Sequence, residues 1–169
     1  MYSLFLNGKP TTSPNCCNFS IIRIRAWESN GQYYFDTPSG ARYVAYFLDL
    51  SSFAENLYTF NFDRIQDGAP NIADSNVFDT ICAILQGFFV KHQNSMLLVC
   101  DTIDGREEAR MRLFNSWFIR IAPEGLTKID RSGKAEEYNL FVSLLVWADN
   151  PMRDALVSIL EEYCQTMLQ

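Results

Sequence analysis

The chain has 169 residues and a net charge of −6, and apolar residues make up 48 % of it. A chain of this length and apolar content can bury a core without disulfides or metals, which excludes intrinsic disorder, collagen-like repeats and disulfide-stapled mini-folds. The acidic balance excludes a general nucleic-acid coat protein, because such proteins carry a basic surplus that displaces phosphate counterions. The composition predicts a soluble, acidic, aromatic-rich globular protein.

The cysteines and the start of the chain indicate a cytoplasmic protein. The five cysteines are Cys16, Cys17, Cys82, Cys100 and Cys164. Their odd number and the lack of a C-x-x-C spacing argue against a secreted disulfide framework and a zinc ribbon. The last three are expected in the core and the first two in a polar loop. Residues 1–6 are too short for the apolar part of a signal peptide, and no run approaches the ~20 apolar residues of a membrane span.

The first 65 residues predict a meander of antiparallel strands. Isoleucines interleave with arginines over 21–25, and Asn30-Gly31 is a hairpin turn signal before 32–36. A second turn at 37–40 leads into the expected strands 41–50 and 57–65, whose side chains alternate between two faces.

The remainder, residues 66–169, predicts alternating helices and strands. The expected elements are helix 76–92, strand 96–100, a helix ending near 121, strands 126–130 and 137–147, and a last helix capped by Asn150 with Pro151 at its first position. The fold prediction is one α+β domain over 1–169, a mostly antiparallel sheet with about three helices packed on it.

The segment 101–117 carries the candidate site. On a helical wheel, Arg106 and Arg110 share a face with the apolar residues Leu113, Phe114, Trp117, Phe118 and Ile121. Guanidinium groups on an apolar face must be paired or must open into a pocket. Glu108 and Arg112 form an ordinary i, i+4 pair on the opposite, solvated side.

Three interpretations of this corner stay open. Asp101 and Asp104 can pair with Arg106 and Arg110 and lock the strand–turn–helix corner. Alternatively, the two arginines and the helix N-terminus form a site for a phosphate or carboxylate. A metal site on the two aspartates has the least support, because the sequence offers no third ligand nearby. Neither a metal nor a cofactor is predicted.

The same segment resembles a known family. The string C-D-x-x-D-G-R-x-x-x-R-x-R-L-F-x-x-W-F, from Cys100 to Phe118, is similar to the signature of small uncharacterised proteins from Bacteroidetes-type bacteria. The upstream string Tyr33–Phe62 also resembles that family, so that the similarity covers roughly residues 30–147. The resemblance implies a bacterial, cytoplasmic protein and supplies no catalytic residues.

The sequence favours a binding or regulatory protein over an enzyme. Nucleophilic catalysis needs a base beside the nucleophile, and the only histidine, His92, ends a helix and is expected to cap or pack. No nucleophile elbow, Walker A motif or dinucleotide fingerprint occurs, and the adjacent glutamate pairs are expected at the surface. The alternative is a phosphate- or nucleotide-handling enzyme that uses Asp101, Asp104, Arg106 and Arg110.

A second candidate surface lies on the N-terminal hairpin. Trp27, Tyr33, Tyr34 and Phe35 place four aromatic residues within nine positions around a turn, more than one sheet face needs. Core packing is the competing interpretation. The expected partner is another protein or a small anionic ligand, and the sequence leaves open whether the chain forms a homodimer.

Overall fold

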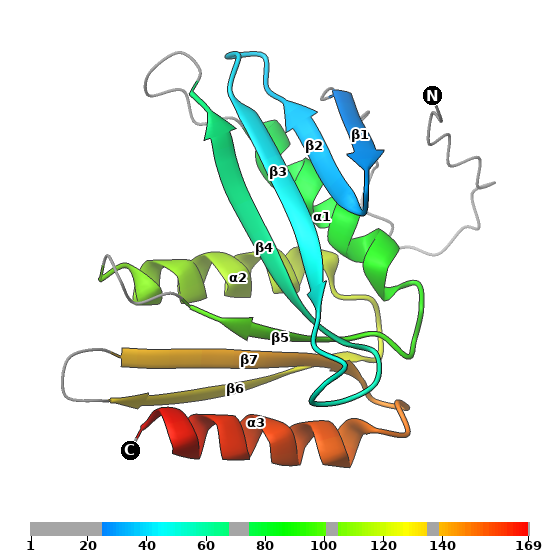
Figure 1. The fold of residues 1–169 in the computed structure, drawn as a ribbon, viewed down its shortest axis with the longest axis vertical. Coiled ribbons are helices and arrows are strands. Elements are labelled where there is room, and N and C mark those ends of the chain that lie inside the picture. The colour runs from blue at the N-terminus through cyan, green and yellow to red at the C-terminus, as the bar shows by residue number, and fades with distance from the viewer. Residues whose placement is uncertain (1–24, 68–74, 101–104, 135–138, 169) are drawn as a thin grey trace.

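A computed structural model describes residues 25–67, 75–100, 105–134 and 139–168. Within these ranges the chain forms a seven-stranded sheet and three helices (Figure 1). The elements are β1 (Arg25–Ser29), β2 (Gln32–Asp36), β3 (Arg42–Asp49), β4 (Leu57–Gln66), α1 (Ser75–Phe89), β5 (Ser95–Val99), α2 (Glu107–Ile121), β6 (Leu126–Lys134), β7 (Asn139–Trp147) and α3 (Arg153–Met167). The predicted α+β fold class is confirmed.

The sheet has the strand order β1-β2-β3-β4-β5-β7-β6. Neighbouring strands are antiparallel except for β4 and β5, which run parallel and pair through Leu57 with Ser95 and Tyr58 with Met96. Parallel neighbours need a crossover connection, and α1 lies in the connection between these two strands. The sheet is therefore mostly antiparallel, as predicted.

The hairpin between β1 and β2 forms where the sequence predicts it. Asn30 and Gly31 both have positive φ, 53° and 76°, as a two-residue hairpin turn of type I′ requires. This turn sets the register, in which Trp27 lies opposite Tyr34 and Ala26 opposite Phe35.

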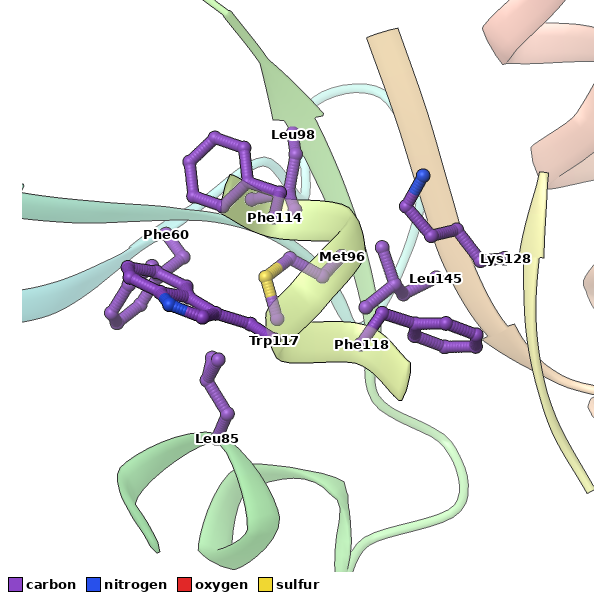
Figure 2. A pocket seen from close by; sticks show the side chains of 9 residues that line it. All are labelled: Phe60, Leu85, Met96, Leu98, Phe114, Trp117, Phe118, Lys128 and Leu145. Atoms are coloured by element: carbon purple, nitrogen blue, oxygen red, sulfur yellow. The ribbon is translucent and has the colours of Figure 1, made fainter. Parts of the chain in front are cut away.

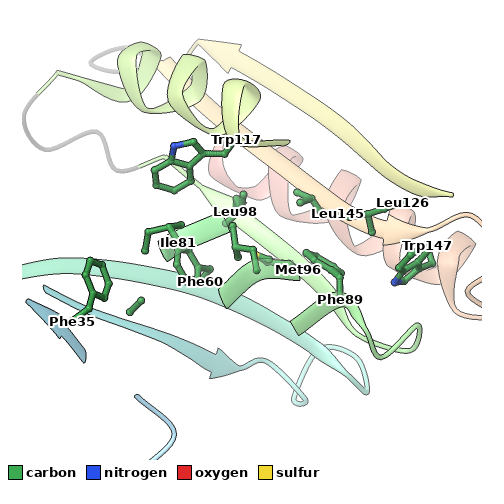
Figure 3. Packing of buried hydrophobic residues seen from close by; sticks show 12 residues of the cluster. Phe35, Phe60, Ile81, Phe89, Met96, Leu98, Trp117, Leu126, Leu145 and Trp147 are labelled. Carbon is green, nitrogen blue, oxygen red and sulfur yellow. The ribbon is translucent and has the colours of Figure 1, made fainter. Parts of the chain in front are cut away.

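The helices cover the two faces of the sheet unequally. Helices α1 and α2 lie on one face, over a cluster shown in Figure 3: Phe35, Ala45, Phe60, Ile81, Leu85, Phe89, Met96, Leu98, Trp117, Leu126, Leu145 and Trp147. Helix α3 lies on the other face, against β6 and β7. Its cluster is Ala54, Leu57, Leu97, Leu140, Val142, Leu144, Val146, Leu156, Leu160 and Cys164.

Several element boundaries differ from the prediction. Strand β6 continues to Lys134, whereas the sequence predicts a strand that ends at residue 130. Leu168 closes over Gly133: a Cβ atom at this position would lie only 2.3 Å from Leu168 Cδ1. The missing side chain thus leaves room for the end of the chain to pack on the strand.

Asn150 caps a turn rather than the last helix. Helix α3 begins at Arg153, and the side-chain oxygen of Asn150 accepts a hydrogen bond from the backbone N–H of Met152, at 2.8 Å. Its amide nitrogen donates to the carbonyl oxygen of Gln93, at 3.2 Å, and to Ser95 Oγ, at 3.2 Å. Asn150 therefore ties the start of β5 to the end of β7.

None of the described helices has both the length and the apolar character that a membrane crossing requires.

Candidate functional site

The predicted corner is only partly described. Asp101 and Asp104 lie outside the described residues. Arg106 is exposed immediately before α2, and Arg110 is half-buried one turn later. Both arginines have interaction partners.

The buried face of α2 is turned relative to the predicted one. Trp117 is 5 % exposed and forms its centre, whereas Leu113, expected on the same face, is 45 % exposed. Glu107, expected at the surface, is only 6 % exposed. The predicted surface pair is present, with Arg112 Nη1 3.5 Å from Glu108 Oε2. The residues of α2 that face the protein interior include Glu107 and Arg110 in the first turn and Phe114 and Trp117 farther along. The first turn of the buried face is therefore polar.

Glu107 is the residue of this corner that sequence reasoning missed. One carboxylate oxygen accepts a hydrogen bond from Asn139 Nδ2, at 3.3 Å, and the other is buried without a hydrogen-bond partner. The carboxylate lies in the first turn of α2, where the helix dipole favours negative charge. A signal was available: Glu107, Phe114 and Ile121 recur every seven residues, the spacing of one helix face.

The thiol of Cys100 lies next to these charged groups, and burial raises its pKa to about 11. Arg110 and Lys128 oppose that rise, while Glu107 adds to it. A thiol with this pKa stays protonated at neutral pH and is a poor nucleophile. Cys100 is therefore a packing residue, as predicted.

A buried ammonium group lies deeper under α2. The side chain of Lys128 is 5 % exposed, and its Nζ forms an ion pair with the half-exposed carboxylate of Asp130. Ser143 Oγ donates a hydrogen bond to Asp130 Oδ1, at 2.6 Å. Asp130 thus connects the buried ammonium group with solvent.

Lys128 also borders a cavity between α1, α2 and the sheet (Figure 2). The cavity has a volume of about 10 Å³. Its lining is Phe60, Leu85, Met96, Leu98, Phe114, Trp117, Phe118, Lys128 and Leu145. This volume is near the minimum for one water molecule and far below the several hundred Å³ of a typical ligand pocket. The cavity does not hold a substrate in this conformation.

The four hairpin aromatics are divided between the two faces of the sheet. Successive side chains of a strand point to opposite faces, so Tyr33 and Phe35 face the core while Tyr34 does not. Phe35 has no exposed surface. The predicted partner surface therefore keeps Trp27 and Tyr34 and loses the other two aromatics to packing.

Trp27 and Tyr34 belong to what we term the open sheet face. We define it by residues that share one side of β1–β3 in the strand register: Trp27, Ser29, Gln32, Tyr34, Asp36, Arg42, Val44, Tyr46 and Leu48. None of these residues belongs to the two clusters under the helices, although Val44 is only 7 % exposed. Figure 1 shows β1–β4 with α1 behind them, on the opposite face.

The centre of this face is a stack of aromatic and charged groups. The rings of Trp27 and Tyr34 stack with centroids 5.8 Å apart and planes 15° apart. The guanidinium of Arg42 lies 5.3 Å from the Trp27 centroid. The same guanidinium binds both oxygens of Asp36, at 2.6 and 2.9 Å, and this contact raises the pKa of Arg42. The guanidinium is charged at neutral pH, and its two hydrogen bonds to Asp36 orient it beside the Trp27 ring.

Among the described residues, no three His, Cys, Asp or Glu side chains are placed to hold a metal ion together.

Comparison with known proteins identifies a family. Residues 73–165, more than half of the chain, match the model of a family of unknown function, DUF6169. No curated protein matches the chain. The matched region begins before α1 and includes the start of α2, with Arg106, Glu107 and Arg110, which we term the α2 corner. The open sheet face precedes the matched region.

Proposed function

This chain belongs to the DUF6169 family of unknown function, and we propose that it is a non-enzymatic interaction module that binds a partner protein through the open sheet face. The observation that carries the proposal is the stack of Trp27, Tyr34 and Arg42 on a part of the sheet outside both helix-covered clusters.

The composition of this face supports binding. Tryptophan, tyrosine and arginine are the residues that contribute most often to binding hot spots, since each offers a large contact area together with hydrogen-bonding groups. Trp27 is 37 % exposed, so apolar surface is available beside the charged pair. Leu48, at the other end of β3, is 49 % exposed.

The α2 corner gives weaker support for a catalytic role. The cavity of about 10 Å³ lies farther along α2, where Phe114, Trp117 and Phe118 line it. At the corner itself, burial raises the pKa of the Cys100 thiol to about 11, so that the thiol stays protonated at neutral pH. A phosphate bound at the start of α2 would also meet the buried carboxylate of Glu107. The phosphate-handling enzyme suggested by the sequence is therefore the less favoured candidate.

Site-specific photo-cross-linking tests the proposal. A photoreactive phenylalanine replaces Tyr34 in the full chain, and in a parallel sample it replaces Glu162, an exposed residue of α3. We expect a specific adduct from position 34 only. The captured protein is then purified and titrated against the wild-type chain and against Trp27→Ser.

The Trp27→Ser change should weaken binding by about 30-fold, the effect of losing one hot-spot side chain. Ile119→Ser is the matched control, because Ile119 is 81 % exposed but lies on α2. Equal binding by the wild type and by Trp27→Ser would contradict the proposal, as would equal adducts from both positions.

The sequence resemblance adds two further expectations to this proposal. A bacterial protein of the Bacteroidetes type that works in the cytoplasm would meet its partner under reducing conditions, which suits a module whose described cysteines are free thiols.

A further inference from the structure

The size of the open sheet face restricts the kind of partner that fits it. Strands lie about 4.8 Å apart and rise about 3.4 Å per residue, so β1–β3, which define this face, present a patch of roughly 300 Å². A stable interface between folded proteins buries about 800 Å² on each partner. The patch is therefore too small for a stable dimer of this chain, and it suits a short segment.

The patch also ends at a sheet edge. Strand β1 is the terminal strand and pairs only with β2 among the described strands. A terminal strand presents backbone N–H and C=O groups that can pair with an added strand. Trp27 is the central residue of β1, so an added strand would lie directly beside its ring.

We propose that the partner binds as an extended peptide segment, which pairs with β1 as an additional strand and places an apolar side chain against Trp27. This inference rests on the proposed function. It goes further by specifying the partner as an extended segment rather than a folded surface or a second copy of the chain.

The register predicts which side chains the segment carries. One row across the face contains Trp27, Tyr34 and Val44, so the peptide residue next to Trp27 should be aromatic or β-branched. The neighbouring row contains Ser29, Gln32 and Tyr46, so the peptide residue two positions away should be polar. The peptide should therefore alternate apolar and polar residues on this face.

A random library of displayed 12-residue peptides, selected against the full chain, supplies the probe. Enriched peptides are synthesised, and their affinities are measured for the wild type, Trp27→Ser and Ile119→Ser. We expect at least a tenfold loss with Trp27→Ser only. Two N-methylated versions of each peptide are compared, one methylated at odd positions and one at even positions. Only one version should lose binding, because only every second backbone N–H group pairs with β1. Hydrogen exchange should slow at the amides of Ala26 and Glu28, which point away from β2 in this register, when a peptide binds.

Three results would overturn the inference. The first is no enrichment above the unselected library. The second is binding that is lost with Trp27→Ser but tolerates N-methylation at every position, which would leave the open sheet face as the interaction surface but reject strand pairing. The third is a dimer in sedimentation experiments that Trp27→Ser dissociates, which would make a second copy the occupant. Cross-linking from position 34 tests the proposed function independently of all three.

Discussion

Arg131 joins the outer strand of the sheet to the last helix by donating two hydrogen bonds to a single carboxylate oxygen of Glu161. The Nε atom lies 2.8 Å and the Nη2 atom 2.5 Å from Oε1. Arg131 is on β6 and Glu161 is on α3, so the contact fixes the helix over the second core cluster. The hydrogen bond from Arg131 is the main reason why the pKa of Glu161 is lowered from its ordinary value of 4.5.

Removing this carboxylate should make the melting temperature of the protein depend less on pH between pH 3 and 7. The lowered pKa means that the folded state binds a proton less readily than the unfolded state, so the contact stabilises the protein fully above about pH 4.5 and is lost as the pH falls further. We expect Glu161→Gln to melt at a lower temperature than wild type at pH 7, and the difference to shrink toward zero near pH 3. Thermal unfolding followed by circular dichroism from pH 3 to 7 measures it.

Glu162→Gln is the control for that series, since Glu162 is the exposed neighbour on the same helix. A pH-independent difference between Glu161→Gln and wild type would show that Glu161 acts through packing rather than charge.

The two members of the buried ion pair under α2 should respond differently to substitution. Asp130→Asn leaves the buried ammonium of Lys128 without its counter-charge, and we expect a loss of about 1–2 kcal/mol in the free energy of unfolding. Lys128→Met replaces that ammonium with an apolar side chain beside an apolar cavity, while the half-exposed Asp130 regains water. We expect this variant to lie within about 1 kcal/mol of wild type or above it. Urea unfolding of both variants provides the comparison, and equal losses would contradict the assigned asymmetry.

Arg110 should prove to be a structural residue of the α2 corner. Arg110 is half-buried one turn after Glu107, and its positive charge opposes the rise in the pKa of the Cys100 thiol. We expect Arg110→Ala to cost about 1–2 kcal/mol of stability, and added phosphate at constant ionic strength to leave the wild-type melting temperature unchanged. A rise in that temperature with phosphate, abolished by Arg110→Ala, would instead establish the anion site that the sequence suggests.

The thiols of half-buried Cys82 and buried Cys100 should resist alkylation. Burial raises the pKa of Cys82 and of Cys100 from 9.0 to about 11, so at pH 8 roughly one molecule in a thousand carries the thiolate at either site. We expect iodoacetamide at pH 8 to modify these two residues slowly in the native protein and fast in 6 M guanidinium. Peptide mass spectrometry resolves each site, and fast native labelling of Cys100 would place it in a reactive environment.

Local signals in the sequence were sufficient for much of the fold. The hairpin at Asn30-Gly31 depends on backbone conformations that few residues adopt, and the strand patterns depend on two-residue alternation, so both can be read from neighbouring residues. The strand pairing between β4 and β5 could not be read in this way, because it joins segments that are distant in the sequence.

The candidate sites were harder to predict, because burial depends on which elements pack together. Glu107 and Glu108 are chemically identical neighbours, yet one contacts Asn139 of β7 and the other pairs with Arg112 at the surface. The aromatic cluster at 33–35 likewise required knowledge of which sheet face the helices cover.

The parallel pairing of β4 with β5 has a consequence for how this architecture can vary. Among the residues that the structure describes, two residue pairs join β4 to β5, and the matched family region begins beyond β4, at residue 73. The β5–β7–β6 strands and the three helices lie almost wholly within the matched region, whereas β1–β4 lie outside it and join the same core through Phe35, Ala45 and Phe60. We expect family members to share the α2 corner and to differ in the surface that they present at the terminal strand.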